Sequence, residues 1–341
     1  MKVNASMAME SLGFLYTYVS VYLKKDDQEI PITMDPMIKE WLDETDASIS
    51  SFLRNDLEFL FAKFHINNWV IFYQLHKEKM ETAEEFLEHL KRMSEEEFRD
   101  LYLKIADIHK IPLEKLTPRM IKSKIEAHFF MKSEGQEKTL LQLFKEPGEW
   151  KKRIIETYEK FYTTYFLPHE DEIRAVLSQR IPEVKQKLAQ DPDGYLDAIS
   201  IGHYKTVLGS RKDVALYVSY CYDRGFTISL KDPIFWFGLR RERLLEEIDR
   251  KAKSELLFNS LSDPKRVEII RLCAKRTWYS NELAKHFGIT SATMSYHINK
   301  LLSAGLLTFE VGEQNKVYYQ INRKIMESLL NAAHDDLLGE P

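Results

Sequence analysis

The chain has 341 residues, of which 44% are hydrophobic and 12% aromatic, so it is not a disordered chain and has ample material for packed cores. This length exceeds that of one small domain and predicts two or three domains. Two cysteines exclude a disulfide-stabilised secreted scaffold and fit a reducing cytoplasm, where we expect the protein to reside.

An apolar run at residues 12–23 follows the N-terminal residues and is interrupted by Thr17 and Ser20. It is too short to cross a bilayer, and no small-residue cleavage site follows it. We therefore expect this segment to be buried, in a soluble protein that has no membrane partner.

Residues 35–190 are predicted to form successive amphipathic helices. The best examples lie at residues 49–64, 67–76, 82–93, 94–108, 118–131 and 149–166. Phosphate-binding glycine loops, paired metal motifs and nucleophile elbows are absent from the sequence, and the chain has only 12 glycines. We therefore predict no enzyme activity, no catalytic residues and no cofactor, and we interpret the acidic residues 170–172 as a helix start.

The character of the sequence changes over residues 197–239. Residues 198–201, 214–220 and 226–230 are rich in β-branched and aromatic side chains, and residues 223–225 are a turn signal. We predict a small sheet or a hairpin here. Residues 239–260 are then predicted to form a charged helix, whose apolar stripe contacts either a second subunit or its own.

Residues 280–305 have the spacing of two short helices joined by a tight turn. Ser280 is predicted to cap the first helix, and Gly288 to end it in the left-handed conformation. Either Thr290 or Ser291 would cap the second helix. Met294, Ile298, Leu301 and Leu302 form the apolar side of that helix.

The opposite side of the second helix is expected to carry short polar side chains. A strand at residues 306–311, a polar turn at 312–316 and a strand at 317–321 follow, which completes the layout of a winged helix-turn-helix. Such a helix enters the major groove, and the turn contacts phosphate or the minor groove. The predicted DNA-binding residues are Ser291, Thr293, Ser295, Tyr296, His297, Asn299, Lys300, Gln314, Asn315 and Lys316.

Four motifs of this region resemble the winged-helix domain of the ArsR-type (arsenic-repressor-like) bacterial regulators. They are the opening at residues 261–266, which includes Asp263 and Pro264, the recognition helix at 291–301, the exit at 304–307, and the polar wing before a tyrosine at 312–318. The resemblance covers about the last quarter of the chain and implies a transcriptional regulator.

Metal-sensing members of that family carry cysteines in the helix before the recognition helix, and residues 281–287 contain none. Cys221 and Cys273 are far apart in sequence, and each is expected to be an ordinary core residue. We therefore predict no metal site. His334, Asp335 and Asp336 are interpreted as a solvated helix face.

Charge supports the DNA-binding interpretation. The net charge is −4, but residues 253–330 contain 11 Lys or Arg against 7 Asp or Glu, whereas residues 1–252 contain 38 against 43. The basic excess therefore lies with the predicted winged helix. Because it is modest, affinity should come from the combined phosphate contacts of a dimer and fall with salt.

These observations predict a mainly α protein with a long helical N-terminal domain (1–240) that includes a small β element near 197–239. A connecting helix (241–252), an α+β winged helix-turn-helix (253–330) and a tail (331–341) follow. The expected function is a homodimeric repressor that binds double-stranded DNA at an inverted-repeat operator. The N-terminal domain would bind a small-molecule effector or stabilise the dimer. The alternatives are an adaptor whose winged helix contacts protein, and an enzyme with a regulatory winged helix.

Overall fold

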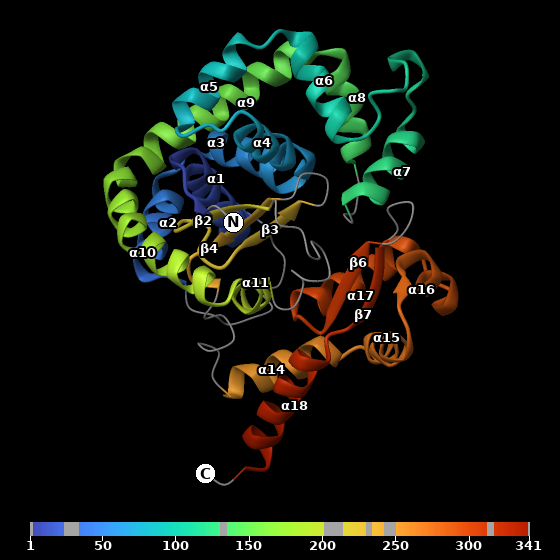
Figure 1. Ribbon diagram of the computed structural model, residues 1–341. Helices are drawn as coiled ribbons and strands as arrows, with labels where there is room; N and C mark the ends of the chain where they lie inside the picture. The colour runs from blue at the N-terminus through green and yellow to red at the C-terminus, as the bar shows by residue number, and fades with distance from the viewer. Residues whose placement is uncertain are drawn as a thin grey trace.

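The computed structural model describes residues 3–23, 34–129, 135–200, 214–229, 234–241, 250–311 and 317–339 (Figure 1). The described residues form two separate hydrophobic clusters, one within residues 3–239 and the other within 256–333. The fold is mainly α with small β elements, as predicted. Among the described residues, no helix is long and apolar enough to cross a membrane.

The first cluster is built mostly of helices at the predicted positions. They are α1 (Met7–Tyr18), α2 (Pro36–Ser48), α3 (Ser51–Leu57), α4 (His65–Lys77), α5 (Ala83–Arg92), α6 (Glu95–Ile105), α7 (Pro118–Phe129), α8 (Gln136–Lys145), α9 (Pro147–Phe161), α10 (Glu170–Gln190) and α11 (Pro192–Ser200). Local signals set several starts: Thr82 and Ser94 each form a capping box with a glutamate three residues later. The acidic residues 170–172 lie in the first turn of α10, as predicted.

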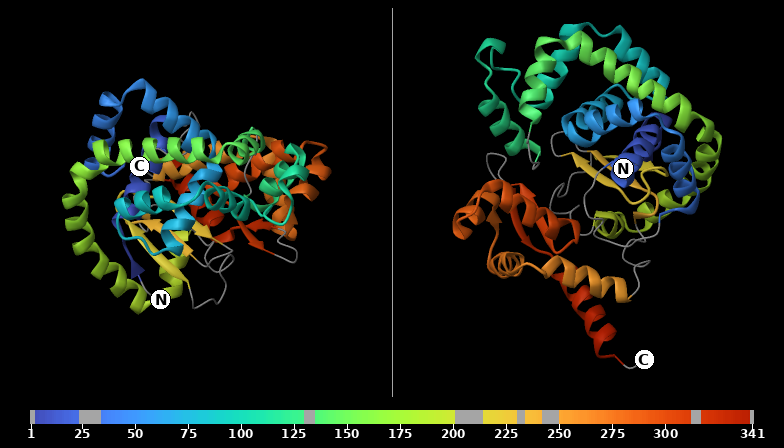
Figure 2. Two further views of the ribbon diagram at one scale, coloured as in Figure 1. Left: turned by 90° about the horizontal axis from the view of Figure 1, so that it is seen from above. Right: turned by 180° about the vertical axis from the view of Figure 1, so that it is seen from behind.

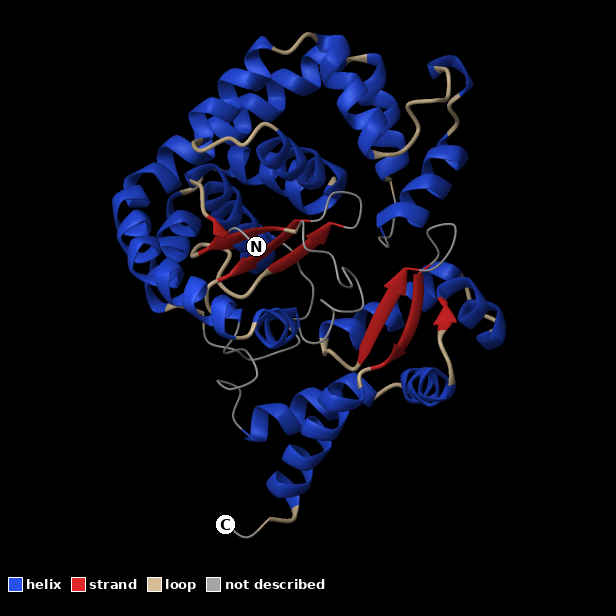
Figure 3. Ribbon diagram, in the orientation of Figure 1, coloured by secondary structure: helices blue, strands red, loops and turns tan. Residues whose placement is uncertain are grey.

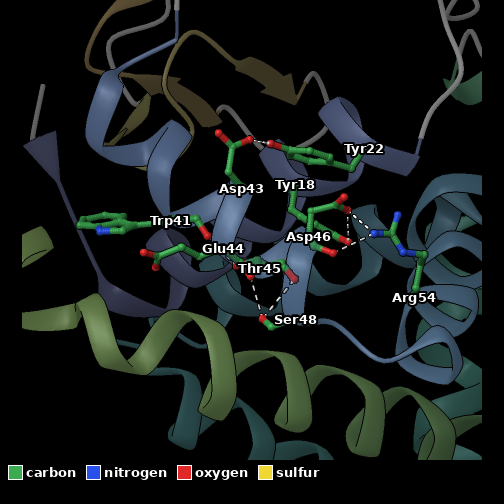
Figure 4. Close-up of polar contacts among 9 residues, drawn as sticks. All are labelled: Tyr18, Tyr22, Trp41, Asp43, Glu44, Thr45, Asp46, Ser48 and Arg54. Atoms are coloured by element: carbon green, nitrogen blue, oxygen red, sulfur yellow. Dashed lines mark hydrogen bonds and ion pairs between the residues drawn. The ribbon is translucent and has the colours of Figure 1, made fainter.

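Three of these helices continue into π-helical turns, namely η1 (Val19–Leu23) after α1, η2 (Glu58–Lys63) after α3 and η4 (Tyr162–Phe166) after α9. Figure 4 shows how α2 lies against the first of them: the Tyr22 hydroxyl donates to Asp43, and the Arg54 guanidinium bonds Asp46. Tyr18 also donates to Asp46, at 3.1 Å. These bonds join α2 to the helix α1–η1 and to α3.

A four-stranded sheet lies inside the helical layer, as Figures 1 and 2 show. Its strands are β1 (Val3–Asn4), β2 (Ala215–Ser219), β3 (Phe226–Ser229) and β4 (Ile234–Gly238), in the order β1-β2-β4-β3. Side chains alternate along β4. Trp236 packs against Tyr16 of α1 and Phe72 of α4, whereas Phe237 packs against Tyr195 of α11. Both faces of the sheet are therefore covered.

One detail of the predicted β element is wrong, and of the two predicted arrangements, a small sheet or a hairpin, the structure has the sheet. Residues 198–200 end helix α11, because Leu196 and Ile199, three residues apart, share a buried helical face. A hairpin of β2 and β3 does not form, since β4 lies between them, parallel to β2 and antiparallel to β3. The turn predicted at residues 223–225 lies at 221–224.

The second cluster is the winged helix, whose β-hairpin is visible in Figure 3. Its elements are α14 (Arg250–Leu261), α15 (Pro264–Lys275), β5 (Trp278–Tyr279), α16 (Ser280–Phe287), α17 (Ser291–Ser303), β6 (Leu307–Val311), β7 (Val317–Ile321) and α18 (Arg323–Leu337), with strand order β5-β7-β6. Leu239 and Arg240 form a turn, so the helix predicted from residue 239 does not begin there. Residues 242–249 of that prediction lie outside the described residues.

Candidate nucleic-acid interface

The helix-turn-helix consists of α16 and α17. Gly288 ends α16 with φ 65°, a left-handed conformation that favours glycine. The Thr290 side chain caps α17 by accepting a hydrogen bond from the Thr293 amide at 3.1 Å. The prediction for Ser280 is wrong: it is the first residue of α16, and Tyr279 holds the cap position without a side-chain bond. The preceding strand β5 sets this start.

Helix α17 presents a polar face away from its core. Met294, Ile298 and Leu301 are buried beneath it, as predicted. Tyr296 is 45% exposed. Of the other residues predicted to bind DNA on this helix, Ser291, Thr293 and Asn299 are exposed, while Ser295 and Lys300 are half-buried. The Ser291 hydroxyl donates to Asn281 of α16 at 3.1 Å, so the two helices are joined at the exposed side.

His297 does not lie on that polar face. Its side chain is almost completely buried, with 5% of the residue exposed, so its predicted place among the exposed polar groups is wrong. The reason is its spacing: His297 stands three residues after Met294 and four before Leu301, on the buried stripe of the helix. The sequence contained this signal.

The wing is formed by β6 and β7, which pair antiparallel up to Val311 and Val317. The three residues predicted at its tip, Gln314, Asn315 and Lys316, lie outside the described residues. Their predicted contact with DNA remains a prediction.

A further cationic group lies at the end of α15, facing the first turn of α16, and the sequence interpretation missed it. The Arg276 guanidinium carbon is 3.6 Å from the centre of the Trp278 ring, and its Nη2 is 2.6 Å from a carboxylate oxygen of Glu282. Hydrogen bonding to Glu282 raises the pKa of Arg276 and lowers that of Glu282. Trp278 in turn donates to the Leu272 carbonyl at 3.2 Å. No sequence motif marks this cluster, because the contacts depend on the fold.

Helices α14 and α18 pack on each other, and Figures 1 and 2 show them side by side. Leu256, Leu257 and Leu329 are in the buried core of this pair. Other large apolar side chains of the two helices face solvent: Phe258 is 51%, Leu330 49% and Leu337 63% exposed.

The cysteines are core residues. Cys221 and Cys273 are buried free thiols, and burial raises the pKa of Cys273 to about 12. Among the described residues, no group of three or more His, Cys, Asp or Glu side chains is placed to hold a metal ion. His334 and Asp335 are both exposed, and Nδ1 of His334 lies 3.2 Å from Oδ1 of Asp335.

Comparisons with known proteins agree with this geometry. A helix-turn-helix domain model matches residues 261–308. The chain is 35% identical over 88 residues to the "Arsenical resistance operon repressor" of Bacillus subtilis (strain 168), an alignment that covers 24% of the chain and 83% of that relative. It is 27% identical over 75 residues to the "Transcriptional repressor SdpR" of the same organism, covering 22% of the chain and 82% of the relative.

No solved structure matches the chain at a significant level. The two alignments and the domain match account for the C-terminal part only, where they agree with the four sequence motifs and with the capped pair α16 and α17. Through that part, the chain belongs to the ArsR-type family of helix-turn-helix transcriptional regulators.

Proposed function

We propose that the protein is a transcriptional repressor that binds an inverted-repeat operator as a homodimer. The observation that carries this proposal is the exposed polar face of α17, which begins at the Thr290 cap and presents Thr293, Tyr296 and Asn299 together. Short polar side chains on the first turns of such a helix can reach base edges in the major groove. The names of both relatives, each a repressor, support the direction of regulation.

The proposed dimer uses the α14–α18 pair. Phe258, Leu330 and Leu337 give these two helices exposed apolar surface that a second copy of the chain would cover. A two-fold axis through this pair would place two recognition helices about one DNA turn, roughly 34–36 Å, apart. This spacing is the reason for proposing an inverted repeat.

We also propose the domain division 1–240, 241–252, 253–330 and 331–341. The two separate hydrophobic clusters support a division into two units. However, α14 extends across residue 252 and α18 across residue 330, so neither border coincides with an element end.

The N-terminal unit is proposed to bind an anionic small-molecule effector. Support comes from Arg241, which follows β4 at the start of the connection to the winged helix. Among the described residues, its guanidinium bonds only the carbonyl oxygens of Ile199 and Arg224, each at 3.0 Å, and it stacks over the Phe226 ring at 4.3 Å. Burial lowers the pKa of Arg241 to about 10. Among the described residues this half-buried guanidinium has no carboxylate partner, an arrangement that favours binding of an oxyanion.

The effector proposal is tested by thermal unfolding with benzoate and with inorganic phosphate as probes. One of these probes should raise the melting temperature of the wild type and leave the melting temperature of the Arg241→Met variant unchanged. Equal shifts in both proteins, or no shift with either probe, would refute a site at Arg241.

DNA binding is tested by selecting bound fragments from a genomic library with the full chain at about 150 mM salt. We expect an enriched inverted repeat. Asn299→Ala should then weaken binding about tenfold, whereas Gln179→Ala, at an exposed position on α10 of the N-terminal unit, should leave affinity unchanged. If no sequence is enriched and both variants behave like the wild type, the winged helix is a protein-binding surface, as the adaptor alternative requires.

A further inference from the structure

A single carboxylate links the start of α15 to the recognition helix. One oxygen of Asp263, Oδ1, accepts a hydrogen bond from the Lys265 amide at 2.7 Å and so caps α15. The other oxygen, Oδ2, lies 3.7 Å from Nδ1 of His297 in the middle of α17. Asp263 therefore caps α15 and also faces α17.

The His297 ring is buried, and its hydrogen bonding is incomplete. Within the described part of the chain, Nδ1 of His297 has no hydrogen-bond partner, although the side chain is only 6% exposed. Buried polar atoms without a partner are uncommon in folded proteins and cost free energy. A separation of 3.7 Å exceeds the usual limit of a hydrogen bond by about 0.5 Å. A small displacement of either helix would complete the bond.

Burial and two neighbouring cations favour the neutral form of the His297 imidazole. Burial lowers its pKa, Asp263 opposes that shift, and Arg266 and Lys265 reinforce it. All three charged neighbours belong to the first turn of α15 or to its cap. A neutral imidazole beside a carboxylate holds its proton on Nδ1, the nitrogen that faces the acceptor.

Asp263 also stands at the corner between α14 and α15. Ser262 precedes it, directly after the last residue of α14, and the Ser262 hydroxyl accepts a hydrogen bond from Arg266 at 2.9 Å. Any displacement of α14 therefore moves the Asp263 carboxylate relative to α17.

We propose that Asp263 and His297 are a positioning pair, which sets the orientation of the recognition helix from below and transmits movement of the α14–α15 corner to it. The Nδ1–H···Oδ2 bond closes when α17 is seated on DNA. This inference rests on the proposed DNA-binding function and adds to it a route by which the rest of the chain reaches the DNA-reading helix.

The test compares matched variants of the full chain on the DNA fragment that the wild type enriches. His297→Leu keeps the buried volume but removes the nitrogen, so affinity should fall about tenfold. His297→Asn places an amide nitrogen near the position of Nδ1 and should retain most of the DNA affinity that His297→Leu loses. Asp263→Ser keeps a helix cap but not the second oxygen, and it should weaken binding to a similar degree.

Because both changes remove one bond, the double variant His297→Leu, Asp263→Ser should bind no more weakly than either single variant. His286→Leu, at an exposed histidine of α16, is the control and should stay within twofold of the wild type. Thermal unfolding of each variant identifies any general loss of structure. Additive losses in the double variant, or wild-type affinity in His297→Leu, would overturn the pairing.

Nitrogen NMR of the His297 ring provides a second readout that needs no DNA. The wild type should show the tautomer protonated at Nδ1, and Asp263→Ser should shift the proton toward Nε2. An unchanged spectrum overturns the pair. A wild type that enriches no DNA sequence overturns the proposed operator binding instead, so the two failures are distinguishable.

Discussion

The Glu10 carboxylate accepts a hydrogen bond from the backbone N–H of Cys221 at 2.8 Å, although the two residues are 211 positions apart. The Tyr220 amide and the Ser219 hydroxyl donate to the same carboxylate at 2.9 and 3.0 Å. Glu10 thus joins α1 to the turn after β2 from a fully buried position. Burial raises its pKa to about 7, while the backbone hydrogen bonds oppose the shift.

This pKa predicts a pH-dependent stability of the N-terminal unit. Since the folded-state pKa lies above the unfolded value, the folded state holds the proton more tightly. The contribution of protonated Glu10 to the free energy of unfolding is fully present below about pH 4.5 and is lost as the pH rises through about 7. Its upper magnitude is about 3 kcal/mol. Urea unfolding of the wild type at pH 5.5 and pH 8 measures it.

Glu10→Gln isolates this contribution. The variant should be less stable at both pH values, because an amide NH2 would face one of the two backbone N–H donors, but its stability should change less with pH. Glu156→Gln, on the exposed face of α9, is the control and should follow the wild type. If wild type and Glu10→Gln change in parallel with pH, Glu10 does not titrate in this range.

Arg276 is expected to contact a DNA phosphate. It is an exposed cation at the end of α15, fixed in direction by Trp278 and by Glu282 of α16. Arg276→Gln should weaken binding to all sequences and reduce the slope of log affinity against log salt by about one per subunit. Arg271→Gln, at an exposed arginine of α15 that pairs with Glu268, is the control. Equal slopes for both variants and the wild type would exclude the contact.

If the α14–α18 pair forms the dimer interface, a charged side chain introduced there should dissociate the dimer. Phe258→Asp or Leu330→Asp should place an unpaired carboxylate in the interface and produce monomers in sedimentation at micromolar concentration. Phe52→Asp, at another exposed aromatic side chain that belongs to the N-terminal unit, should leave the association state unchanged. Persistent dimers in both interface variants would place the interface elsewhere.

The turn between α16 and α17 depends on the backbone of Gly288. A Cβ at this position would have open space, but φ is 65°, so Gly288→Ala introduces backbone strain without a steric clash. We expect a loss of about 1 kcal/mol in unfolding free energy. Gly288→Asn should cost less, because asparagine tolerates this conformation better. Equal stability of both variants in urea unfolding would show that the turn adapts.

Local signals explain which parts were predicted from sequence. Asp263 with Pro264, and Thr290 after Gly288, specify helix ends within a few residues, so the winged helix could be located and its family inferred. In the N-terminal unit the sequence predicted strands at the positions of β2 and β3, but not β1, which has two residues and pairs with a strand that begins only at Ala215. Arg276 and His297 acquire their neighbours from other elements, although the burial of His297 follows from its helical spacing.

The pairing of Val3 with Leu216 also has a consequence for the order of synthesis. Strand β4, the inner strand between β2 and β3, leaves the ribosome only after all the helices from α1 to α11. The apolar side chains of α1 and α4 that cover Trp236 therefore lack this packing partner until β4 has been translated. The winged helix does not depend on β4, because its own long-range contacts, such as those between α14 and α18, lie within residues 250–337. A chain interrupted before residue 234 would expose the inner surface of the helical layer and become a substrate for chaperones and proteases.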